Sequence, residues 1–162
     1  MQSATIAATT ALATAVAALS VVLPAGAGRV DAAQPGDPAV FVTRVVGHIV
    51  ADEYARAWQS LLPAHKRVAP RREYVTCELK SPVCQTLLAT DVLRVAQRAR
   101  RIPGVSERVP VTSVTLRLRV DDPAGGAEQS FTLTFSAVRS GSRWAWILTP
   151  SRYELYRSNS CA

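Results

Sequence analysis

The feature that most constrains the fold is a change of hydrophobic period along the chain. Beyond Gly104, apolar and polar residues alternate, over residues 115–120 and again over residues 131–136. Such alternation is typical of strands that bury one face. Before Pro63, apolar residues instead recur at spacings of three to five, as on one face of a helix. We therefore predict an α+β fold, in which N-terminal helices pack on one face of a curved antiparallel sheet.

The C-terminal half also contains the turns that a meander needs. Residues 121–126 predict a hairpin connection, because they combine Asp, Pro and Gly, and residues 140–142 (Ser-Gly-Ser) predict the next turn. Residues 143–148 then read as a further strand, in which Trp144 and Trp146 share one face. We expect a meander of at least three strands.

The first helix has a recognisable start. Asp37 can cap a helix whose first turn begins at Pro38, where the missing N–H of proline costs nothing. The apolar stripe over residues 41–61 predicts one long amphipathic helix, or two joined near Gly47. Pro63 is expected to end it.

The middle of the chain is less regular. Residues 64–68 predict a short turn, and residues 70–77 predict a helix with Tyr74 on its inward side. Residues 87–102 are ambiguous between helix and strand, and periodicity alone favours a helix. The helical stripe there consists of Leu88, Val92, Val95, Ala99 and Ile102.

The N-terminus has the pattern of an export signal. Residues 1–28 carry no charged side chain, and residues 11–23 form an apolar run. Small residues then predict cleavage within residues 27–33. A retained membrane anchor is the alternative, since a stretch of about 20 apolar residues can span a bilayer. We expect residues 1–33 to be a signal peptide, residues 34–38 a polar linker, and the remaining chain to be secreted or held in the cell envelope.

Three cysteines follow the signal, and export would permit disulfides. Three pairings are open. We favour Cys77 with Cys84, because residues 79–82 (Leu-Lys-Ser-Pro) can turn the chain back between them. Cys161 would then be free or bonded to another molecule; the alternative makes it the partner of Cys77 or Cys84.

Several short motifs carry a family resemblance. Over residues 39–158 the chain resembles small secreted actinobacterial proteins of the NTF2-like (cystatin-like, SnoaL-like) superfamily, which leaves residues 159–162 as a tail. The resemblance implies a cone-shaped sheet wrapped around a long helix, with a pocket at its open end. It also implies a strand, not a helix, over residues 91–102. The motifs are Trp58-x-x-Leu61-Leu62-Pro63-Ala64-His65, Arg71-x-x-Tyr74-x-x-Cys77, Trp144-x-Trp146-x-Leu148 and Tyr153-Glu154-x-Tyr156.

Candidate catalytic residues come from the same resemblance, because some superfamily members are isomerases, dehydratases or cyclases. His65 could serve as general acid or base, since its ordinary pKa lies near neutrality, with Tyr54 or Tyr74 as hydrogen-bond donor. The competing interpretation is that all three are packing residues. No metal site is predicted, because His48 and His65 lie 17 residues apart without a ligand pattern, and no cofactor motif is present.

Two further groups suggest binding. Trp58, Trp144 and Trp146 are candidate walls for an apolar or planar ligand, although core packing is the favoured interpretation. The second group is a basic run in a chain of net charge +7, and guanidinium groups suit phosphate or carboxylate. A solvated arginine face is the favoured interpretation there. Nucleic acid is not favoured, because the run lacks interleaved aromatic residues. The candidate anion-binding residues are Arg94, Arg98, Arg100 and Arg101.

Three functional hypotheses result. The preferred one is a non-enzymatic exported module that binds an envelope component or a protein partner, because clustered acid and base groups are missing. The second is a small-molecule isomerase or dehydratase centred on His65 and a tyrosine. The third is a basic adhesion domain for anionic surfaces. Contact with a membrane is expected only through an uncleaved N-terminal segment.

Overall fold

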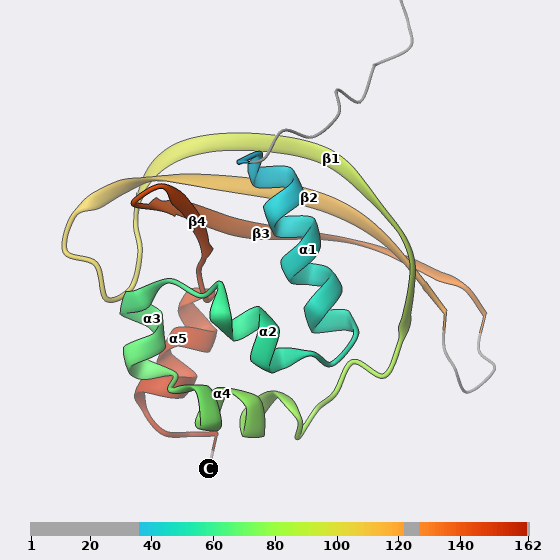
Figure 1. The fold of residues 1–162 in the computed structure, drawn as a ribbon, viewed down its shortest axis with the longest axis horizontal. Coiled ribbons are helices and arrows are strands. Elements are labelled where there is room, and N and C mark those ends of the chain that lie inside the picture. The colour runs from blue at the N-terminus through green and yellow to red at the C-terminus, as the bar shows by residue number, and fades with distance from the viewer. Residues whose placement is uncertain (1–35, 122–126, 162) are drawn as a thin grey trace, which may run out of the picture. The chain divides into compact units, whose positions relative to one another are not determined.

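The computed structural model describes residues 36–121 and 127–161. Within them, helices precede an antiparallel sheet of order β1-β2-β3-β4, which confirms the α+β class (Figure 1). The predicted export segment, residues 1–33, lies outside the described residues, as does most of the predicted hairpin connection. The helices are α1 (Pro38–Val50), α2 (Tyr54–Gln59), α3 (Pro63–Val68), α4 (Arg71–Glu78) and α5 (Pro150–Arg157); the strands are β1 (Thr86–Arg101), β2 (Arg108–Asp121), β3 (Gln129–Ser140) and β4 (Arg143–Trp146).

Helix α1 begins as its sequence predicts. The carboxylate of Asp37 accepts a hydrogen bond from the backbone N–H of Ala39 at 2.7 Å, and Pro38 occupies the first turn. The helix does not end near Gly47, which lies within it; the break falls at residues 51–53. There Asp52 has a left-handed φ of 55°, and its carboxylate accepts hydrogen bonds from the Tyr54 hydroxyl and the Val83 N–H. These bonds hold the turn between α1 and α2.

Two short helices follow α2. Pro63 does not merely end a helix: it is the first residue of α3, so residues 64–68 are helical and not a simple turn. Helix α4 matches its prediction, and Tyr74 is buried as expected. Figure 1 shows α1 lying beneath the arch of β1, with the other helices grouped further down.

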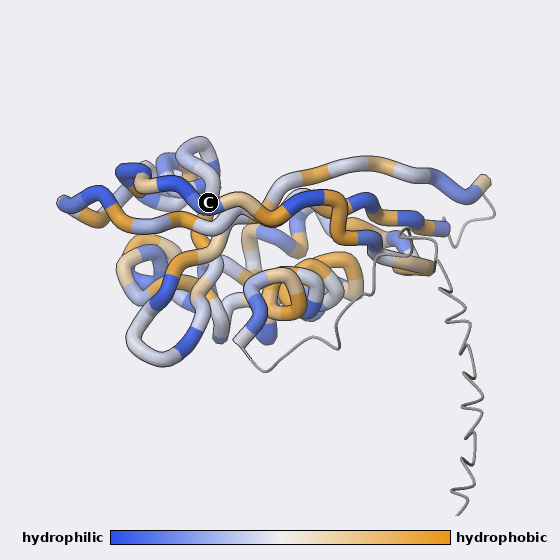
Figure 2. Tube along the Cα trace, turned by 90° about the horizontal axis from the view of Figure 1, so that it is seen from above, coloured by the Kyte–Doolittle hydropathy of each residue, from blue (hydrophilic) through white to orange (hydrophobic). Residues whose placement is uncertain are grey.

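Strands β2 and β3 supply the apolar floor under α1. Even-numbered residues of β2 from 114 to 120 are buried, whereas the alternate residues are less buried or exposed. Figure 2 shows this alternation of hydrophobic and hydrophilic residues along the strands. The principal core cluster joins these strands to α1 and α2; its largest fully buried members include Val42, Val45, Val46, Leu61, Tyr74, Leu116 and Leu118.

The helix that periodicity favoured over residues 87–102 is wrong, because this segment is strand β1 as far as Arg101. Strand β1 pairs antiparallel with β2 over its whole length. Its register shifts between Leu87 and Ala89 and again between Val92 and Arg94, where β1 carries one extra residue each time. The expected strand over residues 91–102 is therefore present, and the meander has β1 as an additional outer strand.

Helix α5 was not predicted. Thr149 caps its first turn by accepting a hydrogen bond from the Arg152 N–H, and Pro150 lies at its first position. Its Tyr153 and Tyr156 are buried. The ring of Tyr156 packs 5.7 Å from that of Tyr74, which joins α5 to α4.

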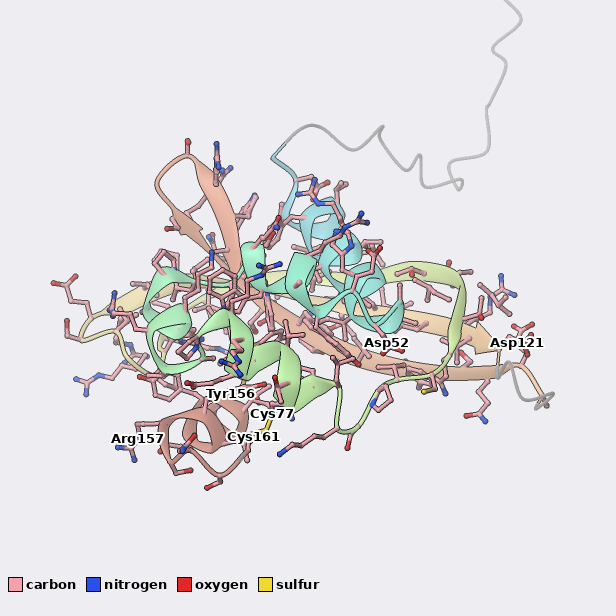
Figure 3. The ribbon with its side chains drawn as sticks, turned by 60° about the horizontal axis from the view of Figure 1, so that its bottom comes forward. Asp52, Cys77, Asp121, Tyr156, Arg157 and Cys161 are labelled. Atoms are coloured by element: carbon pink, nitrogen blue, oxygen red, sulfur yellow. A yellow bond between two sulfur atoms is a disulfide. The ribbon has the colours of Figure 1, made fainter. Side chains whose placement is uncertain are left out.

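The predicted Cys77–Cys84 disulfide is wrong. Cys77 pairs instead with Cys161, at a Cα–Cα distance of 5.6 Å (Figure 3). Cys77 is buried in the last turn of α4, and the segment after α5 returns to this point, where Lys80 donates a hydrogen bond to the Cys161 carbonyl. Cys84 is exposed and unpaired, in a backbone segment that the Asp52 carboxylate holds through Val83.

Candidate anion-binding groove

On the face of the sheet opposite α1, β2 and β3 carry a group of hydroxyl side chains. This group, called the hydroxyl floor below, consists of Ser113, Thr115, Thr134 and Ser136. Because side chains alternate along a strand, Ser113 and Thr115 point away from the face that carries Val114. The register places Ser136 beside Ser113 and Thr134 beside Thr115. The paired hydroxyl oxygens lie 3.4 Å and 3.0 Å apart, respectively. Each hydroxyl retains capacity for another hydrogen bond.

Arginines of β1 border this floor. Arg94 pairs with Thr115, Arg98 with Val111 and Arg100 with Val109, so the three share the face of the hydroxyl groups. All three side chains are exposed. Within the described residues, none of them forms an ion pair.

The opposite border is the segment that leads from β4 into α5. Residues 147–150 and Arg152 line a cavity of about 740 Å³ together with the hydroxyl floor and the arginines of β1. Ile49 of α1 and Tyr74 of α4 line it as well, so the cavity is not confined to the face opposite α1. All four predicted anion-binding residues line it: Arg94, Arg98, Arg100 and Arg101. Of the candidate groups predicted from the sequence, the arginine run is the one whose members all line the same cavity.

The cavity is strongly positive. Glu78 is the only acidic residue in its lining. That carboxylate is already paired with Arg152 and accepts a hydrogen bond from the Tyr156 hydroxyl. The remaining arginines face the cavity without compensation from the lining, so a ligand with negative charge would complete the site.

His65 lies outside this cavity and is completely buried. Its Nδ1 accepts a hydrogen bond from the Leu148 N–H at 2.9 Å, so Nε2 carries the proton and donates to the Pro103 carbonyl at 3.0 Å. Burial lowers the pKa of His65, an effect that the Pro103 carbonyl partly opposes. Both ring nitrogens are therefore occupied, and neither is available to a substrate.

The candidate tyrosines do not join His65. Tyr54 donates its hydroxyl proton to Asp52 at 2.6 Å, and burial together with this bond raises its pKa to about 12. Tyr74 lines the cavity, and burial raises its pKa as well. No hydrogen bond between the described residues links either tyrosine to His65.

The three tryptophans are dispersed. Trp58 donates its indole N–H to the Ala69 carbonyl, Trp144 to Gly36 and Trp146 to Ala57. Only Trp146 lines the cavity. The three do not form a common ligand wall.

No group of three or more His, Cys, Asp or Glu side chains is arranged to hold a metal ion among the described residues. None of their helices is both long and apolar enough to span a bilayer.

Comparisons with known proteins do not assign a family. No family model matches the chain, and no curated protein matches it. One similar solved structure is the crystal structure of a SEC-C motif containing protein from Psychrobacter arcticus, with 19% identity and a TM-score of 0.38 over 69% of this chain and 58% of that one. The chain thus spans less than two thirds of that protein. The predicted membership of the NTF2-like superfamily is accordingly corrected: no family model matches the chain, and the similar structure described here is of a SEC-C motif containing protein.

Sequence reasoning missed the hydroxyl floor and Arg152. The hydroxyl residues are the polar members of the alternating pattern in β2 and β3. That pattern is normally used to identify the apolar, buried members, so the polar ones were not examined as a site. Arg152 could be placed only by predicting α5, and Thr149 followed by Pro150 was a usable signal for the start of that helix.

Proposed function

We propose that the chain is a non-enzymatic binding module whose groove takes an anionic group of phosphate, sulfate or carboxylate type. The observation that carries this proposal is the position of Arg94, Arg98 and Arg100 on the face of the hydroxyl floor, beside a cavity. Guanidinium groups bind such anions through paired N–H donors, and serine and threonine hydroxyls can donate to the remaining oxygens.

The extent of the groove favours a ligand larger than a single ion. The cavity of about 740 Å³ lies within the range of sites that bind small organic molecules. Phe135 and Trp146, which the register places on the α1 side of the sheet, also contribute to its lining. The proposed ligand therefore carries anionic groups on a larger body, as an anionic lipid or an acidic polymer does.

An enzymatic role has less support. An isomerase or dehydratase would need an acid or base that reaches the ligand. His65 is buried and uses both ring nitrogens within the fold, and Tyr54 is bonded to Asp52. These contacts support a structural role for His65 and Tyr54, and Tyr74 lines the cavity without an acid or base partner at His65.

The location of binding follows from the N-terminal pattern. Residues 1–33 have the pattern of an export signal, so we place the module in the cell envelope or outside the cell. Anionic lipid headgroups and acidic envelope polymers are the ligands of suitable chemistry in that compartment.

A direct test compares two probes of the same charge chemistry. Long-chain polyphosphate is titrated with the protein by fluorescence anisotropy, and vesicles of phosphatidylglycerol are compared with vesicles of phosphatidylcholine by sedimentation. We expect binding to one or both anionic probes and none to phosphatidylcholine. Replacing Arg94, Arg98 and Arg100 together by Gln should weaken the interaction by about tenfold or more, since three charge-assisted contacts are lost.

The matched control removes the same charge elsewhere. Replacing Arg56, Arg67 and Arg143 by Gln leaves the groove intact and should change the affinity much less. Affinity should also fall as salt rises from about 50 to 500 mM, because exposed charges are screened. Equal losses in the two triple variants, or binding that persists in high salt, would contradict the proposed site.

A further inference from the structure

Strand β1 is an outer strand with an unusually apolar exposed surface. It is 16 residues long and, among residues 36–121 and 127–161, has a partner strand only on its β2 side. Four of its large apolar side chains are 45–48% exposed, and all lie between residues 88 and 95. Long apolar edge strands tend to pair with other strands unless they are covered. Figure 1 shows β1 arching along the outside of the sheet. The four exposed residues, called the β1 patch below, are Leu88, Val92, Leu93 and Val95.

Opposite charges flank the centre of this patch. Asp91 is the only acidic residue of β1, and Arg94 follows it across the register shift at Leu93. Because of the extra residue there, Asp91 and Arg94 point to the same face of the sheet, as their pairing with Arg117 and Thr115 shows. Neither Asp91 nor Arg94 takes part in an ion pair within the described chain.

We propose that β1 is the interface for a second copy of this chain, which pairs antiparallel with it about a two-fold axis through the Val92–Leu93 bulge. In this register Asp91 of one copy lies opposite Arg94 of the other, and symmetry repeats the pair. The β1 patches of both copies meet at the centre. The two sheets become one continuous sheet of eight strands, since each described sheet has four.

Charge complementarity favours a second copy as the partner. Opposite charges that face each other across an antiparallel pair stabilise it, and like charges destabilise it. In the proposed register the extra residue at Leu88 places Arg98 opposite Thr86, which is uncharged. Sliding the copies far toward their arginine-rich ends would place Arg94 opposite Arg98, whereas a shorter slide would pair Asp91 with Arg98 instead. The strand is thus complementary to itself in the proposed register, and the cross-linking below distinguishes it from the shifted one.

The dimer would also enlarge the positive surface. A two-fold axis perpendicular to a sheet keeps equivalent faces on the same side, so the arginines at 98 and 100 of both copies would share one face. The dimer and the proposed function share Arg94, which lines the groove and also faces Asp91 of the other copy in this register. Asp91 does not line the groove, so Asp91→Arg separates loss of the dimer from loss of ligand binding.

Charge reversal tests the interface in solution by sedimentation equilibrium of the full chain at about 5 to 200 µM. We expect a concentration-dependent dimer for the unaltered protein. Asp91→Arg places two arginines opposite each other and should weaken association by about tenfold or more, as should Arg94→Asp. The double variant Asp91→Arg, Arg94→Asp should regain the association. Glu107→Arg, on an exposed loop outside β1, makes the same charge change and should have no effect.

Cross-linking tests the register. In a background of Cys84→Ser, a Thr90→Cys protein is mixed with a Val95→Cys protein under oxidation, because the proposed register places these positions opposite each other at cross-strand distance. We expect a covalent heterodimer of the two proteins, and little of it when Thr90→Cys is mixed with Gln97→Cys. A monomer at 200 µM, a failure of the charge swap to restore association, or equal cross-linking in the two mixtures would overturn the proposal.

Discussion

The disulfide between Cys77 and Cys161 should be the largest single covalent contribution to stability. It closes a loop across a sequence separation of 84 residues. A disulfide restricts the unfolded chain, and the loop-entropy relation gives about 4.6 kcal/mol for a ring of this length at 25 °C. The same relation gives about 2.5 kcal/mol for the ring of about eight residues that a Cys77–Cys84 bond would close.

The perturbation is Cys161→Ser, with Cys84→Ser as the matched control. Unfolding of each oxidised protein is followed in urea by circular dichroism. With a urea dependence of about 2 kcal/mol per molar for a domain of this size, Cys161→Ser should lower the midpoint by about 2 M. Cys84→Ser should leave the midpoint nearly unchanged, because Cys84 is exposed and unpaired.

Peptide mapping checks the same bond without unfolding. Trypsin cleaves after Arg72, Lys80 and Arg157, so the oxidised protein should release residues 73–80 joined to residues 158–162. The reasoning is refuted if Cys161→Ser unfolds at the wild-type midpoint while Cys84→Ser loses about 1 M, since the shorter ring would then be the native one.

Three further predictions concern buried positions. Because burial lowers the folded-state pKa of His65 below its usual 6.5, the unfolded chain takes up the proton first as the pH falls. The free energy of unfolding should therefore fall between pH 7 and pH 5, and a His65→Gln variant, although less stable, should lose this contribution to the slope. Gly104→Ala should destabilise by about 1–3 kcal/mol in urea, because φ is 71° and the new Cβ would lie 2.7 Å from the Tyr153 hydroxyl; Gly141→Ala, with a similar φ and open space, should cost less. Leu116→Ala should cost about 2–5 kcal/mol in thermal or urea unfolding, and a loss below 1 kcal/mol would contradict the burial of Leu116 in the core.

The regular part of the fold was predictable because its residues agree at every level. Asp37 followed by Pro38 satisfies the free N–H groups of a helix start by local chemistry alone. The alternation in β2 survives in the structure because one face of that strand is buried under α1. In both cases the local signal and the tertiary environment favour the same conformation.

The disulfide was not predictable in the same way. Its two cysteines are brought together by α5, whose buried Tyr156 packs on Tyr74. Sequence proximity favoured Cys84, since a short turn costs little to close. The packing of α5 and the hydrogen bond that holds Val83 to Asp52 decide otherwise, and both join segments distant in sequence.

The candidate groove was likewise predictable only in part. The arginine run was visible as composition, and a strand sends every second member of such a run to one face. Which face it would share with the hydroxyl groups depended on the register between β1 and β2. The second border depended on α5, so a charged run could be predicted while the cavity beside it could not.

Strand β1 shows how a strand can imitate a helix in sequence. Its residues on the α1 side of the sheet include Leu87, Thr90, Val92 and Val95, with spacings of three, two and three. Each spacing of three contains one bulge, because the extra residue delays the return to the same face by one position. Two bulges five residues apart therefore turn a period of two into a mean period between two and three, and the apolar bulge residue Leu88 adds a further position to the helical stripe. Periodicity measures the average spacing of one face, so it cannot separate a helix from a strand whose register shifts twice; pairing with β2 decides between them.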